Sequence, residues 1–79
     1  MDNNSVFKKV KLATAKLSGL RDPDFKECFR RGGFDVTTMQ FDGYKHKPGH
    51  KRYKPMPDEA IEAFLSGMID YAKEREDGC

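Results

Sequence analysis

Apolar residues recur at helical spacing in four stretches of this chain, and the first stretch lies near its start. Its members follow one another at intervals of four, three and four residues, with Phe7 beside them: Val6, Val10, Ala13 and Leu17. This spacing places them on one face of an α-helix and leaves the lysines of the stretch mostly on the solvent side. We expect Asn3, Asn4 or Ser5 to cap this helix and Ser18-Gly19 to break it.

A second, shorter helix is expected after this break. It begins at Asp22-Pro23, with the aspartate as its cap and the proline at the first helical position, where a missing N–H is harmless. Two aromatic rings and a cysteine form its inward face: Phe25, Cys28 and Phe29. The helix ends at Gly32-Gly33, because one glycine can adopt the left-handed conformation of a helix C-terminus and the next lets the chain turn.

A third helix runs from about Thr38 to Tyr44, and Asp35 or Thr37 caps it. Gly43 weakens its last turn.

The fourth helix begins at Pro57-Asp58 and carries a continuous apolar face that supplies about half of the core: Ile61, Phe64, Leu65, Met68, Ile69 and Ala72. Residues 74–79 are expected to fray. The pattern therefore predicts an all-α fold, a compact bundle of about four helices in a single domain over residues 1–79.

The segment between the last two helices has an unusual composition. Residues 45–57, hereafter the basic loop, hold three prolines, one glycine and five cationic side chains, with no acidic residue. We expect an extended, solvated loop that Tyr53 and Met56 anchor. Residues 58–77 are strongly acidic by contrast, so the net charge of +2 hides a basic loop followed by an acidic helix.

Length and composition limit the classes of protein to which the chain can belong. With 79 residues, 37% hydrophobic and 35% charged, it can form one thin core of modest stability, which a partner subunit would improve. No stretch is long and apolar enough to span a membrane, and the first residues do not form a signal peptide, so we expect a cytoplasmic protein. Cys28 and Cys79 are then expected to be free thiols, with Cys28 buried as a small apolar residue.

An ordered set of landmarks covers nearly the whole chain. It consists of Asn4-Ser5-Val6-Phe7, Phe25 to Phe29, Gly32-Gly33-Phe34-Asp35-Val36-Thr37, Phe41 and Tyr44, Tyr53, Pro57-Asp58, and Phe64-Leu65-Ser66-Gly67-Met68-Ile69. The set resembles the YehS-like family of bacterial proteins of unknown function (domain of unknown function 1456). The resemblance implies an all-helical fold and assigns no catalytic residue.

The chain departs from the pattern of that family in three places. The family usually carries two tandem copies where this chain has one, the position of Tyr44 is usually Trp, and Lys45 to Arg52 replace an acidic stretch. The last change reverses the charge of the loop. The usual tandem pair implies that two single copies form a homodimer here.

Few residues are suited to catalysis or to metal binding. His46 and His50 are four residues apart, but Pro48 and Gly49 between them oppose a helix, and the loop offers no Cys, Asp or Glu to complete a metal site. The acids are mostly spread over solvated helix faces, both histidines lie among cations, and no Gly-rich phosphate motif occurs. We therefore expect a protein that is not an enzyme and needs no cofactor or metal.

The order of helix, turn and helix over residues 22–44 resembles helix-turn-helix domains of the lambda-repressor type. In this interpretation the protein is a regulatory module, and its third helix enters the major groove of double-stranded DNA. Gln40 then pairs with an adenine edge, while Thr37 and Thr38 contact bases or phosphates. The cationic side chains neutralise phosphates of the DNA backbone: Lys45, Lys47, Lys51, Arg52 and Lys54.

Two features oppose DNA binding: the connection over residues 32–36 is longer than a tight turn, and phosphate would repel Asp42. The alternative is a small protein-interaction module, such as an inhibitor or adaptor carried by a phage or mobile element, without nucleic-acid binding. It rests on Phe7, Phe41 and Tyr44, which a single copy would expose and a protein partner or second copy would bury. The basic loop could also simply offset the acidic last helix of the same or a neighbouring subunit.

Overall fold

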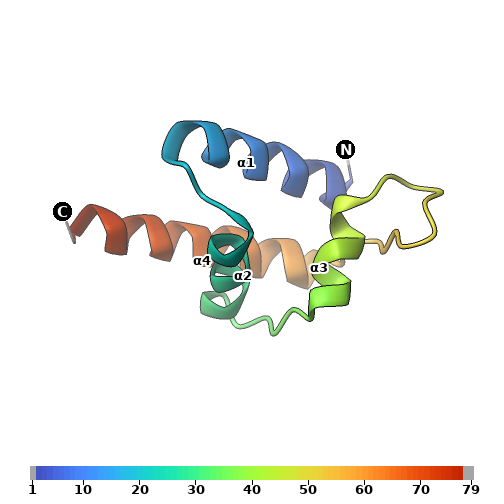
Figure 1. Cartoon of the computed structure of the whole chain (residues 1–79). Helices are drawn as coiled ribbons and strands as arrows, with labels where there is room; N and C mark the ends of the chain where they lie inside the picture. Colours follow the sequence, from blue (N-terminus) through green and yellow to red (C-terminus); the bar gives the residue numbers. More distant parts are fainter. Residues whose placement is uncertain (1, 78–79) are drawn as a thin grey trace.

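The fold is built from helices. The computed structural model describes residues 2–77 of the chain, and the side chains of residues 2–74. This part holds four α-helices and no strand: α1 (Asn3–Ser18), α2 (Asp22–Arg31), α3 (Thr38–Lys45) and α4 (Asp58–Asp77). In Figure 1, α1 and α4 run in the same general direction, α2 is viewed almost along its axis, and α3 lies near the ends where α1 and α4 begin. The expected all-α bundle of about four helices is confirmed.

The N-terminus of α1 is capped one residue earlier than the pattern predicted. The carboxylate of Asp2 accepts the backbone N–H of Ser5 at 2.8 Å, so the cap is neither Asn3, Asn4 nor Ser5. The two asparagines are instead turned toward the chain that precedes α4, where they hold backbone groups. At the other end, Gly19 closes α1 in the left-handed conformation, with a φ of 70°.

The start of α2 is also displaced by one residue. Its cap is Arg21, and Asp22 is already helical, so Pro23 occupies the second helical position. The side chain of Arg21 makes no cap hydrogen bond, and the carboxylate of Asp24 accepts the backbone N–H of Arg21 at 2.9 Å, which is the reciprocal half of a capping box. Asp22 is thereby left to pair with lysines of the neighbouring helices.

Aromatic rings from all four helices meet in the core. The ring centroid of Phe7 on α1 lies 4.9 Å from that of Phe64 on α4, and Phe29 on α2 lies 5.0 Å from Phe64. Phe41 and Tyr44 on α3 complete the cluster and are each 2% exposed. A single copy therefore buries Phe7, Phe41 and Tyr44 by itself. The expectation that these three rings need a partner is wrong, because α3 turns its aromatic face inward against α1 and α2.

Small residues allow α2 and α4 to cross at close range. A Cβ atom added to Gly67 on α4 would lie 1.7 Å from the carbonyl oxygen of Cys28 on α2. A Cβ atom added to Gly32 would lie 1.9 Å from the carbonyl oxygen of Ala63. Gly32 thus permits this contact besides ending α2, and Gly33 takes the left-handed turn with a φ of 89°. The thiol of Cys28 lies at the same crossing, where burial raises its pKa to about 11.

The last turns of α1 and α4 extend past the core. Leu17 is 85% exposed and Ile69 is 59% exposed, although both belong to the predicted apolar stripes. The predicted burial of Ala13, Leu65 and Ala72 is likewise wrong. The buried face of α4 consists of smaller residues together with one aromatic ring and one isoleucine: Ala60, Ile61, Ala63, Phe64 and Gly67. Near the ends of the two long helices the reason is that α2 and α3 are too short to cover them, whereas Ala13 and Leu65 lie mid-helix on exposed faces.

The end of α4 also differs from expectation. The helix continues to Asp77, so residues 74–77 are helical where fraying was predicted, while Gly78 and Cys79 lie outside the described residues. Within residues 2–77, none of the helices has both the length and the apolar character that a membrane span requires.

Replacing Gly67 with Ala should destabilise the protein in spite of alanine's better helix propensity. The propensity gain is about 1 kcal/mol, but the new methyl group meets backbone atoms of α2 that cannot rotate away. We expect the free energy of unfolding, measured in urea by circular dichroism, to fall by about 2 kcal/mol or more. The matched control Ser66→Ala, at an exposed neighbouring position, should change it by less than about 0.5 kcal/mol. Equal stability of Gly67→Ala and the natural protein would contradict this close crossing.

Candidate nucleic-acid interface

The basic loop is folded rather than extended. The backbone N–H of His50 donates to the carbonyl of Lys47 at 3.1 Å, and that of Tyr53 donates to the carbonyl of His50 at 3.0 Å. Gly49 takes a positive φ of 95° inside the first of these turns. Lys45 is the last residue of α3, so the connection between α3 and α4 begins at His46. Internal turns therefore present the loop lysines in a defined arrangement, where the pattern predicted an extended, solvated loop.

Asn4 fastens the basic loop to α1. Its side chain is 4% exposed, and its amide nitrogen donates to the carbonyls of Tyr44 at 3.2 Å and Lys54 at 2.9 Å. Its amide oxygen accepts the backbone N–H of Met56 at 2.8 Å. One side chain thus joins the end of α3 to the returning arm of the loop. Met56 is buried and Tyr53 is half-buried, in agreement with their predicted anchoring role.

Gly43 brings the same arm of the loop against α3. A Cβ atom at this position would lie 2.8 Å from the carbonyl oxygen of Arg52, and the backbone N–H of Lys54 donates to the carbonyl of Gly43 at 3.1 Å. The pattern treated this glycine only as a weakness of the helix. Its actual role is to let residues 52–54 lie directly on α3.

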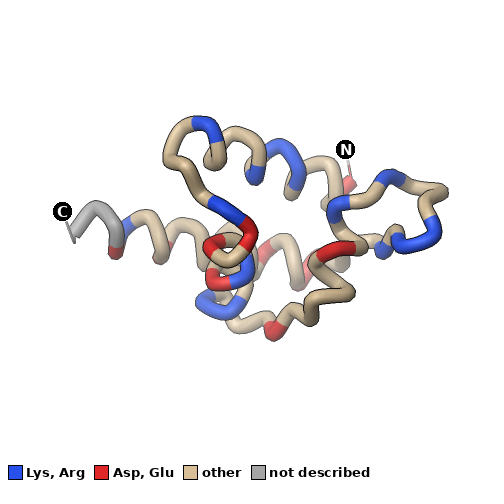
Figure 2. The backbone as a smooth tube through the Cα atoms, viewed as in Figure 1, with Lys and Arg blue, Asp and Glu red and all other residues tan. Residues whose placement is uncertain are grey.

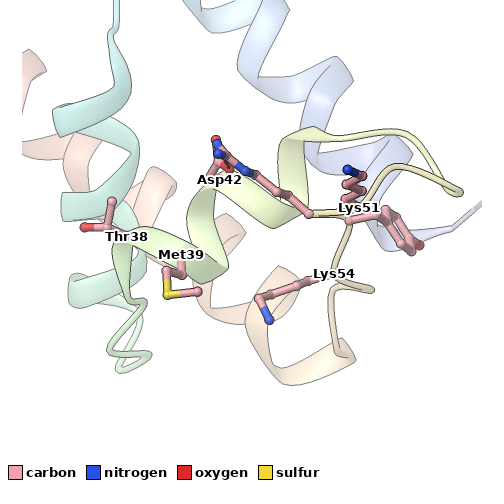
Figure 3. A pocket seen from close by; sticks show the side chains of 7 residues that line it. Thr38, Met39, Asp42, Lys51 and Lys54 are labelled. Atoms are coloured by element: carbon pink, nitrogen blue, oxygen red, sulfur yellow. Dashed lines mark ion pairs between the residues drawn. The ribbon is translucent and has the colours of Figure 1, made fainter.

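A groove lies between α3 and this arm of the loop. Its volume is about 620 Å³, and it is lined by Thr38, Met39, Asp42, Lys51, Arg52, Tyr53 and Lys54 (Figure 3). Four of the residues predicted to contact DNA line it together: Thr38, Lys51, Arg52 and Lys54. The pattern missed Met39 and Tyr53 as parts of this surface, and it assigned Tyr53 only to the anchoring of the loop.

The other predicted site residues lie outside this groove and mostly have structural contacts. Thr37 and Gln40 cap α3 reciprocally: the hydroxyl of Thr37 accepts the N–H of Gln40 at 3.1 Å, and the amide oxygen of Gln40 accepts the N–H of Thr37 at 2.9 Å. Lys45 pairs with Asp22 at 3.2 Å and lies over the ring of Phe41. Lys47 is exposed at the first turn of the loop.

The loop cations have few acidic side chains near them. Among the described side chains, no carboxylate lies within ion-pair distance of Lys47, Lys51 or Lys54. Arg52 reaches Asp42 only at 3.9 Å, with most of its side chain exposed. Figure 2 shows these blue positions on a loop that projects from one end of the molecule. The loop therefore presents positive charge that its own chain leaves largely uncompensated.

Several cations of the helices are by contrast paired. Lys11 and Lys45 approach Asp22 from α1 and α3, at 3.1 and 3.2 Å. Burial acts to raise the pKa of Asp22, but the hydrogen bonds from the two lysines outweigh it, and the pKa lies below its usual value. This cluster joins three helices, and the carboxylate of Asp22 largely compensates the positive charge of Lys45.

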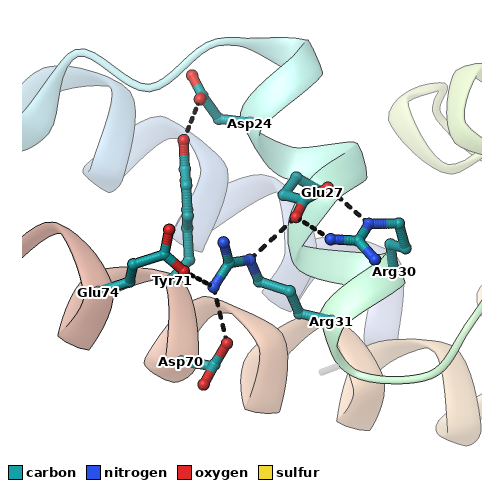
Figure 4. Close-up of polar contacts among 7 residues, drawn as sticks. All are labelled: Asp24, Glu27, Arg30, Arg31, Asp70, Tyr71 and Glu74. Carbon is teal, nitrogen blue, oxygen red and sulfur yellow. Dashed lines mark hydrogen bonds and ion pairs between the residues drawn. The ribbon is translucent and has the colours of Figure 1, made fainter.

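Two arginines of α2 form ion pairs with acidic side chains of α2 and α4. The guanidinium of Arg31 contacts Glu27 at 3.1 Å, Asp70 at 2.8 Å, and Glu74 (Figure 4). Glu27 also accepts from Arg30, and Arg30 together with Arg31 lowers the pKa of Glu27 to about 2 against the opposing effect of burial. Asp70 and Glu74 of α4 are thus paired with α2. Among the described side chains, no ion pair joins the basic loop to α4, and the interpretation that the loop offsets this acidic helix stays a prediction.

The two histidines of the loop stack on each other. Their ring centroids are 3.9 Å apart and their planes are parallel. His46 also contacts Asp42 at 3.2 Å, and the ring of His50 accepts the backbone N–H of Arg52 at 3.0 Å. The described residues contain no group of three or more His, Cys, Asp or Glu side chains that could hold a metal ion. The histidines shape the loop through these contacts.

Comparison with known families gives a match over almost the entire chain. The model of a family described as a protein of unknown function (DUF1456) matches residues 3–73. The chain belongs to the DUF1456 family. This confirms the resemblance that the sequence landmarks indicated, and the matched span includes Asn4, the basic loop and the groove. Membership of the DUF1456 family assigns no activity to these features. Comparison with curated proteins and with solved structures gives no match.

Replacing Asn4 with Ala should loosen the basic loop. The change leaves the carbonyls of Tyr44 and Lys54 and the N–H of Met56 without their side-chain partner, and a buried unpaired group costs about 1–3 kcal/mol. We expect a loss of about 2 kcal/mol in unfolding free energy and faster hydrogen exchange at the Met56 amide. Asn3→Ala is the matched control, because Asn3 is less buried and should show a smaller loss. An equally protected Met56 amide in Asn4→Ala would show that other contacts hold the loop.

The arginine cluster predicts a response of stability to acid. A glutamate in the unfolded chain takes up its proton near pH 4.5, whereas folded Glu27 does so near pH 2. The stability from Glu27 is therefore present above about pH 4.5 and is lost as the pH falls to about 2. In a series of thermal unfolding curves across this range, Glu27→Gln should lose less stability than the natural protein. The control Glu62→Gln, at an exposed position on α4, should follow the natural protein; if both variants do, the cluster contributes no pH dependence.

Proposed function

We propose that this protein is a non-enzymatic regulatory module that binds double-stranded DNA, chiefly by contacts with the phosphate backbone of the DNA. The observation that carries the proposal is the basic loop, where Lys47, Lys51 and Lys54 have no carboxylate partner among the described side chains. Cations in this state can neutralise phosphates and release counterions from DNA. The hydrogen bonds of Asn4 support the proposal further, because a loop already held in place loses less conformational entropy on binding.

We assign a smaller part to α3 than the helix-turn-helix interpretation does. Recognition of adenine by Gln40 requires both ends of its amide, and the oxygen is already bonded to the N–H of Thr37. The connection between α2 and α3 covers residues 32–37, which is longer than a tight turn. Thr38 is exposed beside the loop cations and is suited to a phosphate contact. Binding is accordingly expected to depend more on charge than on DNA sequence.

A second candidate function, protein interaction, is favoured by a different surface. Large apolar side chains are exposed on the two long helices, with Leu12 at 59%, Leu17 at 85% and Ile69 at 59%. Such residues can be covered by a protein partner or by a second copy in a homodimer. Sedimentation of the natural protein and of Leu17→Ser tests this: a dimer that the substitution dissociates would support the second candidate.

The test of DNA binding compares two pairs of neutral substitutions. One variant carries Lys47→Gln and Lys51→Gln in the loop, and the matched control carries Lys16→Gln and Lys73→Gln on α1 and α4, so both lose the same charge. Binding of a labelled duplex is followed by fluorescence anisotropy between about 50 and about 200 mM salt. We expect the loop variant to bind more weakly. The negative slope of its log affinity against log salt should be shallower by about 2, since each phosphate contact contributes about 0.9.

The control pair should keep nearly the affinity and slope of the natural protein. If the two variants lose affinity equally, net charge and not the loop is responsible, and the assignment to the loop is wrong. If the natural protein does not bind duplex DNA at low salt, the proposed function fails and protein interaction becomes the better explanation. Circular dichroism of each variant verifies that the helices are intact.

A further inference from the structure

The groove between α3 and the basic loop is lined by both cationic and apolar side chains. On one side, Lys51 and Lys54 supply positive charge, and both are exposed. On the α3 side, Met39 is a large apolar side chain that is 74% exposed, and half-buried Tyr53 lines the groove from the loop, next to Lys54. Figure 3 shows Met39 and Lys54 turned toward the space between α3 and the loop. A hydrated phosphate chain needs the lysines but makes no use of a thioether or an aromatic ring.

Asp42 defines which part of a ligand can enter this groove. Its carboxylate is in the lining, held by His46 at 3.2 Å and by Arg52 at 3.9 Å. A phosphate would be repelled from this position, whereas the N–H groups on the edge of a nucleobase could donate to it. The phosphates of a ligand are therefore favoured near Lys51 and Lys54, and an uncharged ring is favoured inside.

We propose that this groove binds an unpaired nucleobase of a DNA whose duplex part lies on the basic loop. This proposal rests on the proposed function. The base stacks on Tyr53 and contacts Met39, while the phosphates on either side of it meet Lys51 and Lys54. The volume of about 620 Å³ falls within the range of about 300–1,000 Å³ that is usual for sites binding small organic molecules, so one nucleotide fits. The preferred ligand is thus a duplex with a single-stranded overhang.

The experiment compares three labelled DNAs that share one duplex sequence. The first is blunt, the second carries a short overhang, and the third carries an overhang of the same length in which the nucleotides are abasic. The second and third have the same phosphates, so their difference isolates the bases. Stacking of one base predicts that the overhang with bases binds about fivefold to about a hundredfold more tightly than the abasic one.

Variants of the apolar lining identify the groove as the site. Tyr53→Ala and Met39→Ala should each bring the affinity ratio of normal to abasic overhang close to one, while Tyr53→Phe should keep the ratio, since the ring remains. Leu12→Ala is the matched control, because Leu12 is also exposed but lies on α1 outside this groove, and it should not change the ratio.

The outcomes separate this inference from the proposed function. Equal affinity for the normal and abasic overhangs, or a ratio that Tyr53→Ala and Met39→Ala leave unchanged, would overturn the inference while blunt-duplex binding still supported the function. Failure to bind any of the three DNAs would overturn both. A ratio above about five that only the groove variants abolish supports the groove as a site for an unpaired base.

Discussion

The close crossing of α2 and α4 is the constraint on which the rest of the structure depends. Gly32 and Gly67 remove the side chains that would hold the two backbones apart, so Gly32 lies against the backbone of Ala63 and Gly67 against that of Cys28. This closeness lets the aromatic rings of the four helices reach one another in a core of few residues. In a chain of 79 residues there is little other apolar surface to bury, and a small increase in the helix separation would open that core.

The crossing also determines how charge is distributed over the molecule. It brings Arg31 of α2 within reach of Asp70 and Glu74 on α4, so the acids of the last helix are neutralised on that face. Asp22 similarly collects Lys11 and Lys45 near the other helices. The basic loop at one end has few acidic neighbours by comparison with these clusters. The local charge of the loop, more than the net charge of +2, governs which ligands approach it.

Local sequence patterns predicted the positions of the helices well. They predicted poorly which elements pack against each helix. The four helices, the buried face of α2 and the basic loop follow from spacing and composition, because each depends on residues close in sequence. The burial of Leu17 was wrongly predicted, since periodicity identifies an apolar face but not whether another element covers it. Asn4 near a helix start resembles a cap, and nothing local indicates that its partners lie fifty residues away. The groove was missed for the same reason, because Met39 and Tyr53 come to line one surface only through the folded loop.

The hydrogen bonds of Asn4 have a consequence for the order of folding. They join the second residue of α1 to the carbonyl of Lys54, so the loop is fastened only after both ends of this span have come together. Contacts so distant in sequence form late, because closing a long stretch of chain is entropically unfavourable until other contacts compensate. During synthesis, α1 emerges from the ribosome well before Lys54 does. The cationic surface is thus completed only in a chain that is already folded, and truncated or unfinished chains will lack it.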